Sequence, residues 1–221
     1  YPCGLGKTNA LLSILKARPD LLVLVVVQTL SEVDRIISSV PKGRIYAPEG
    51  PGSLHRTKGE QLEPLVRAGR SIVITHNLYE RAGILAYQGA FSSYQVIIDE
   101  VPNAVSVSDL ELDAVSFNEF YVGPGYCRIE QGGLVSITNK GEEEEARLKT
   151  ALDERLISNM RSGRLYYDGK KHFIQTIPTS LFTHADSVTV LTFLSEGSLF
   201  LKFLEKHQID YRVLRSRKCN Q

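Results

Sequence analysis

The chain has 221 residues, 43% of them hydrophobic, which is enough to bury one large core. The net charge of +1 gives no overall basic field, so any contact with nucleic-acid phosphates must come from a local patch. The longest apolar run, Leu21–Val27, is far below the roughly 18 residues that cross a bilayer, and the three cysteines have neither CxxC spacing nor an even number. We therefore expect a folded, cytoplasmic protein without a membrane partner.

The first part of the chain alternates between helix and apolar strand. Leucines recur at helical spacing over residues 7–18, and Pro19 is a stop signal. Leu21–Val27 is apolar on both faces, which is typical of a strand in a parallel sheet covered by helices on both sides. Ser31 is then expected to cap a helix over 31–39, whose inner face carries Val33, Ile36 and Ile37.

The same alternation continues beyond a loop rich in Pro and Gly at 41–59. Ser71–Thr75 and Val96–Ile98 repeat the buried-strand pattern, and helical segments over 59–68 and 78–87 precede them. Strands that alternate with helices predict an α/β fold with a doubly wound, mostly parallel sheet.

The last part of the chain returns to this pattern after a different block. Val188–Phe193 is an apolar strand, a helix with Leu199 and Phe203 follows it, and Tyr211–Leu214 completes the alternation. Between them, Glu142–Met160 is predicted to be a charged helix that ends at Gly163, followed by a hairpin over 164–177 that turns at Asp168-Gly169. We assign residues 1–102 and 179–221 to one core and 103–178 to an inserted α+β subdomain.

A glycine-rich turn opens the first helix, with the sequence Cys3-Gly-Leu-Gly-Lys-Thr8. Phosphate binding needs this order, because the N–H groups of the turn and of the helix end point at phosphate oxygens. Lys7 is expected to reach the β- and γ-phosphates of ATP, and the Thr8 hydroxyl to ligate Mg²⁺. The predicted nucleotide contacts are Gly4, Leu5, Gly6, Lys7, Thr8 and Asn9.

Two carboxylates end a buried strand in Tyr94-Gln-Val-Ile-Ile-Asp-Glu100. Ligands of open α/β sheets bind at this edge. Asp99 is expected to hold Mg²⁺, and Glu100 to orient or deprotonate the attacking water. A lone acidic pair is more commonly a solvated strand end, so only the two motifs together indicate a nucleotide site.

These motifs resemble those of the first RecA-like domain of superfamily 2 DExx-box helicases, which are P-loop NTPases. Gly4–Thr8 is similar to their first motif, with Tyr1 at the position usually held by Gly or Ala, and Asp99–Pro102 occupies the DEAD/DEAH position with Val-Pro as its last two residues. The resemblance covers roughly the first 100 and the last 40 residues. It implies a strand ahead of the phosphate loop, so we expect the chain to be a piece of something longer.

The resemblance also implies residues that couple ATP to DNA or RNA. Val25–Thr29, Ile72–His76 and Val190–Ser195 look like further helicase motifs, which assigns nucleic-acid or coupling roles to Thr29, Thr75, His76 and Thr192. Helicases close ATP between two such domains, so a second RecA-like domain or a neighbouring subunit is expected to supply an arginine finger.

Basic residues form two further clusters whose role the sequence leaves open. Lys42, Arg44, His55, Arg56 and Lys58 lie in the 41–59 loop, and Lys170, Lys171 and His172 at the hairpin turn. Either cluster can contact phosphates or be an ordinary solvated surface, and the second alternative is the commoner one.

Three functions are also open: a helicase or translocase, another P-loop motor, or an ATP-binding scaffold that is inactive without a second domain.

Overall fold

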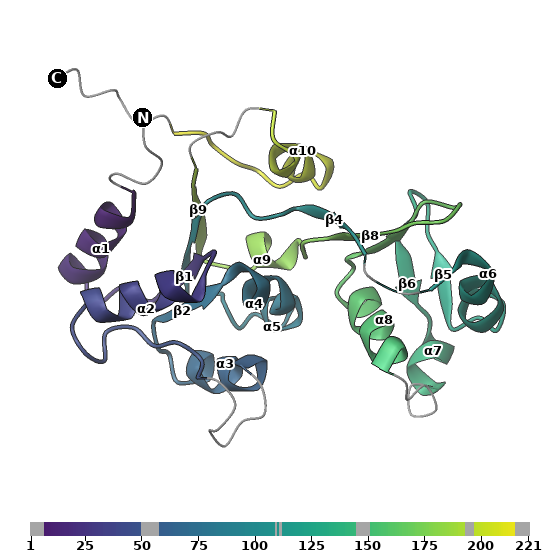
Figure 1. The fold of residues 1–221 in the computed structure, drawn as a ribbon, viewed down its shortest axis with the longest axis horizontal. Helices are drawn as coiled ribbons and strands as arrows, with labels where there is room; N and C mark the ends of the chain where they lie inside the picture. The colour runs from purple at the N-terminus through teal and green to yellow at the C-terminus, as the bar shows by residue number, and fades with distance from the viewer. Residues whose placement is uncertain are drawn as a thin grey trace.

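The computed structural model describes residues 7–49, 58–108, 110, 112–144, 151–192 and 197–214. Over these residues, a parallel sheet with the strand order β2, β1, β3, β9 lies between two layers of helices (Figure 1). The strands are β1 (Val23–Val27), β2 (Ile72–Thr75), β3 (Gln95–Asp99) and β9 (Ser187–Leu191). The expected mixed α/β class with a parallel sheet is confirmed.

Both faces of this sheet are covered, because successive residues of a strand point to opposite sides and both sets are apolar. Val23, Val25 and Val27 of β1 belong to the core on the face of α1 (Lys7–Ala17) and α2 (Leu30–Ser39). Leu24 and Val26 belong to the core on the opposite face, where the helices are α3 (Lys58–Arg67), α4 (His76–Arg81), α5 (Gly83–Tyr87), α9 (Ser180–Thr183) and α10 (Leu199–Lys206). All five residues of β1 are buried, so this strand contributes to both cores. Each fully buried valine or leucine stabilises the fold by about 1.5–3 kcal/mol.

Residues 105–176, here called the second lobe, form a separate hydrophobic cluster between β3 and β9 in the chain. The ring of Phe117 lies at its centre, with the rings of Tyr121, Tyr167 and Phe173 around it at centroid distances of 6.1, 5.5 and 4.9 Å. Its strands are β4 (Val105–Val107), β5 (Cys127–Ile129), β6 (Val135–Ile137), β7 (Leu165–Tyr167) and β8 (Phe173–Thr176). Its helices are α6 (Ala114–Phe117), the π-helix η1 (Asn118–Val122), α7 (Asn139–Glu144) and α8 (Ala151–Arg161).

Helices α4, α5 and α9 are joined where the chain returns from the second lobe to the sheet. The Tyr79 hydroxyl donates to the Leu181 carbonyl at 2.7 Å, and the Ser180 hydroxyl donates to the Gly83 carbonyl at 2.8 Å. A Cβ at Gly83 would lie 2.5 Å from the Pro178 ring, so the close approach requires glycine.

The start of α2 differs from the sequence prediction. Thr29, rather than Ser31, is the N-cap, and Thr29 and Glu32 form a reciprocal capping box. Of the three residues expected on the inner face, Val33 and Ile36 are buried, whereas Ile37 is 36% exposed. The helix therefore presents a narrower apolar face to the sheet than expected.

Two predictions in the last third of the chain are also corrected. Tyr211–Leu214 pairs with no strand among the described residues, and Leu214 is 75% exposed, so the expected final strand is wrong. The predicted helix over 142–160 is described as α7 and α8, and residues 145–150 between them lie outside the described residues. The hairpin is confirmed, but its loop spans 168–172 rather than two residues.

Candidate active site

The carboxyl ends of all four parallel strands lie at one edge of the sheet, here called the carboxyl edge. Thr29 follows β1 with one residue between, Thr75 ends β2, Asp99 ends β3, and Thr192 follows β9 directly. The residues that the sequence predicted as acidic, coupling or nucleic-acid contacts are therefore brought to the same edge. This is the edge at which ligands of open α/β sheets bind.

The amino end of α1 points to the carboxyl edge. Residues 18–22 connect the helix directly to the start of β1, so its carboxyl end lies at the opposite edge of the sheet. The helix has 11 residues and is about 16 Å long, close to the length of the five-residue β1. Buried Leu11 and Leu15 hold it along the sheet, so the positive end of its dipole faces the strand ends.

Several predicted nucleotide contacts fall at this helix end. Gly4, Leu5 and Gly6 lie outside the described residues, and Lys7 and Thr8 begin α1. Asn9 is exposed in the same first turn. The motif thus leads directly into a helix, as phosphate binding requires.

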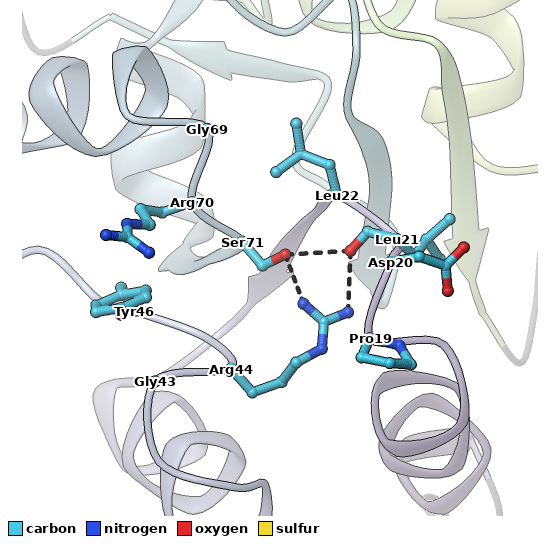
Figure 2. A pocket seen from close by; sticks show the side chains of 10 residues that line it. All are labelled: Pro19, Asp20, Leu21, Leu22, Gly43, Arg44, Tyr46, Gly69, Arg70 and Ser71. Carbon is cyan, nitrogen blue, oxygen red and sulfur yellow. Dashed lines mark hydrogen bonds between the residues drawn. The ribbon is translucent and has the colours of Figure 1, made fainter.

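Arg44 fixes the other end of α1. Its Nε donates to the Leu15 carbonyl at 3.0 Å, and its Nη2 donates to the carbonyls of Arg18 and Leu21, each at 2.9 Å. Its Nη1 donates to the Ser71 hydroxyl at 2.8 Å (Figure 2). A cation beside carbonyls at a helix carboxyl end is stabilising. Arg44 is thus a structural residue, which corrects its inclusion among the basic residues of the 41–59 loop considered for phosphate contact.

A pocket of about 310 Å³ lies beside this arginine, at the amino edge of the sheet (Figure 2). Its Arg70 guanidinium lies 5.3 Å from the centre of the Tyr46 ring, a cation–π contact. The pocket lies at the edge of the sheet opposite to the one that carries Asp99 and Glu100. We therefore assign it no part in the candidate active site.

Asp99 and Glu100 differ in burial and in backbone conformation. Asp99 is 9% exposed, whereas Glu100 is half-buried and has a φ of 70°. The Glu100 amide donates to the Leu191 carbonyl at 2.9 Å, which ties the acid pair to β9. A left-handed backbone costs a residue with a side chain about 1–2 kcal/mol, and such strain concentrates at functional sites. The sequence carried no signal for this conformation, because glutamate does not favour it.

His76 reaches the acid pair from β2, on the far side of β1. Its Nε2 lies 3.0 Å from the Asp99 carbonyl oxygen. Thr75, directly before it, is half-buried and occupies the N-cap position of α4 without a side-chain cap bond. His76 and Asp99, predicted separately, are thus in direct contact.

The other two predicted coupling residues are placed differently. The Thr29 hydroxyl accepts from the Glu32 amide at 3.3 Å in the capping box, so it has a structural role whatever else it contacts. Thr192 is half-buried after β9, on the side of β3 opposite to β1. The coupling residues therefore extend along the whole carboxyl edge rather than forming one cluster.

The donor set fits a magnesium ion held jointly with a nucleotide. Mg²⁺ keeps several water ligands and takes one or two carboxylates together with phosphate oxygens. Over the described part of the chain, no three His, Cys, Asp or Glu side chains are grouped to hold a metal by themselves. Asp99, a single buried carboxylate at the strand end, is suited to the shared kind of site.

Comparison with protein-family models, curated proteins and solved structures finds no match to this chain. None of the helices described here combines the length and the apolar character needed to span a bilayer.

Proposed function

We propose that the chain is the RecA-like, nucleotide-binding domain of a helicase or translocase, which couples ATP hydrolysis to movement on DNA or RNA. The observation that carries the proposal is that the amino end of α1 and the Asp99–Glu100 strand end lie at the same edge of a parallel sheet. The Gly-Lys-Thr sequence at that helix end gives the position its chemistry. An acidic pair or a glycine-rich turn by itself is common, whereas their convergence on one edge is specific.

Each residue then has a separate task in phosphoryl transfer. The amides at the start of α1 and the Lys7 ammonium bind the β- and γ-phosphates and offset their negative charge. Glu100 orients the attacking water and accepts its proton. Thr8 and Asp99 would hold Mg²⁺, which when bound neutralises charge on the phosphate oxygens.

We assign contact with a nucleic-acid strand to Thr75 and Thr192, because Thr75 ends β2 and Thr192 follows β9, on either side of the acid pair. A second RecA-like domain or a neighbouring subunit would complete the site with an arginine. Such an arrangement makes hydrolysis depend on the partner and on the nucleic acid.

ATP turnover measured with and without single-stranded DNA or RNA tests the proposal. We expect turnover that rises on addition of at least one of the two. Turnover that neither nucleic acid changes would favour another P-loop motor. Tight ATP binding without turnover would favour a scaffold that needs a second domain, and absence of ATP binding would overturn the nucleotide site altogether.

A further inference from the structure

The hydrogen-bond ladder between β1 and β3 stops just before the acid pair. Its last pair is Val26 with Ile98, and one more step would pair Val27 with Asp99. Every second residue of β3 bonds β1 in a parallel ladder, and the Gln95 amide donates to the Leu22 carbonyl. Continued to Asp99 in the same register, this pattern would have the Asp99 carbonyl accept from the Gln28 amide.

Gln28 instead bonds elsewhere. Its amide donates to the Glu32 carboxylate at 3.1 Å, as part of the turn into α2. The Asp99 carbonyl oxygen lies 3.0 Å from the Nε2 of His76. A carbonyl oxygen only accepts, so Nε2 carries the proton and donates. The bond is available to the neutral Nε2–H tautomer and to the imidazolium alike.

The peptide unit between Asp99 and Glu100 is therefore held from both sides. His76 bonds its carbonyl, and the Leu191 carbonyl accepts from its N–H at 2.9 Å. Glu100, directly after this peptide, has the left-handed φ of 70°. Since both ends of the peptide are fixed, its plane and the direction in which the Glu100 side chain leaves the backbone are fixed as well.

The histidine itself is rigidly placed. It is the first residue of α4, and Tyr79 one turn later is fully buried and bonds the Leu181 carbonyl. The helix also meets the second lobe, where Arg164 donates to the Glu80 carbonyl at 3.4 Å. A donor on a helix anchored at two places can orient a neighbouring group without moving with it.

We propose that His76 is a positioning residue for Glu100: it holds the Asp99–Glu100 peptide so that the Glu100 carboxylate points to the attacking water. This inference rests on the proposed ATPase function and adds to it a residue that acts through the backbone rather than on nucleic acid. The specific feature is the Nε2–H donor, not the aromatic ring or a positive charge.

A matched pair of variants isolates that donor. In His76→Gln the amide nitrogen falls where Nε2 lies in histidine, whereas in His76→Asn it falls where Nδ1 lies and does not reach the carbonyl. Single-turnover hydrolysis and ATP affinity are measured for both in saturating nucleic acid, with thermal unfolding as the folding control. We expect His76→Asn to slow hydrolysis about 10- to 100-fold with nearly unchanged ATP affinity, and His76→Gln to restore most of the rate.

Equal rates for the wild type and His76→Asn would overturn the inference, and so would equal losses in the two variants. A backbone measurement separates this failure from failure of the proposed function. The Glu100 amide resonance and its three-bond coupling report φ without any nucleotide. If the wild type lacks turnover, the proposed function fails. The positioning of Glu100 then stands only if His76→Asn alone changes φ, and it is overturned if φ is the same in all three proteins.

Discussion

The Nη1 of Arg44 donates to the Ser71 hydroxyl at 2.8 Å, and that hydroxyl in turn accepts from the Val23 amide at 3.2 Å. This chain of bonds joins the loop after α2 to Ser71, directly before β2, and to Val23, the first residue of β1. Since the same guanidinium holds the carboxyl end of α1, one side chain fixes three elements at the amino edge of the sheet.

Replacing Arg44 with Met should lower the free energy of unfolding by about 1.5–3 kcal/mol, because charged hydrogen bonds to part-buried carbonyls are lost. Urea unfolding measures the change. Arg70→Met is the matched control, since Arg70 lines the same pocket but is exposed and contacts the Tyr46 ring. Similar losses in both variants would contradict the structural role of Arg44.

Replacing Lys7 with Ala should abolish ATP hydrolysis and greatly weaken nucleotide binding, because the cation that faces the β- and γ-phosphates is removed. Calorimetric titration with ATP and a turnover assay measure the two effects. Lys16→Ala, in the last turn of the same helix, is the control and should behave as the wild type. Normal turnover of the Lys7 variant would remove the phosphate-loop assignment.

Replacing Glu100 with Gln should preserve ATP binding and stop hydrolysis, because the amide keeps the shape of the side chain but is no base. The rate is expected to fall by about 100-fold or more. Binding and turnover are measured on the same sample. If ATP binding disappears together with hydrolysis, Glu100 is a structural residue.

Glycine at position 100 should give a more stable protein than alanine there, by about 1 kcal/mol, because glycine adopts a φ of 70° without strain. Both variants lack the carboxylate, so their difference reports the backbone alone. Chemical unfolding of Glu100→Gly and Glu100→Ala measures it. At an ordinary strand position the order would be reversed, and that result would show that Glu100 is not left-handed in solution.

Reversing the charge of Lys170 and Lys171 together should weaken binding of single-stranded DNA or RNA and flatten its salt dependence by about 0.7 per lost phosphate contact. The loop that carries them is ordered, because the Asp168 carboxylate accepts from the amides of Lys170, Lys171 and His172. Basal ATP turnover should not change. Lys16→Glu with Lys42→Glu, exposed residues at the amino edge, is the control. An unchanged salt slope would make the loop an ordinary solvated turn.

Those features that depend on local pattern were predictable from the sequence. The strands β1, β2 and β3 are runs of apolar, mostly β-branched residues, and such runs are stable only where both faces are buried. The cap of α2 was also available, because Thr29 and Glu32 have the spacing of a capping box. Ser31 is a residue type that favours caps, but it lacks that spacing, because Asp34 lies three residues after it.

Features that depend on neighbours in space were not predictable. Nothing in the sequence around Arg44 indicates that it bonds carbonyls of α1 and of the segment after it, since these lie more than 20 residues away in the chain. Tyr211–Leu214 alternates like a strand but has no neighbouring strand to pair with. The contact between His76 and Asp99 depends on the strand order, which places β1 between β2 and β3. It also depends on the Gln28 amide, which donates to Glu32 instead of continuing the ladder.

The connection from Glu100 to the second lobe is too short and too well anchored to act as a flexible hinge. Residues 101–104 alone separate Glu100 from β4, and both Pro102 and Ala104 are buried. The Ala104 carbonyl accepts from the Ile177 amide at 3.0 Å, which clamps the outgoing and returning chains together. Proline removes one rotatable backbone angle from the segment. A rotation of the second lobe is therefore expected to move the backbone of the acid pair with it.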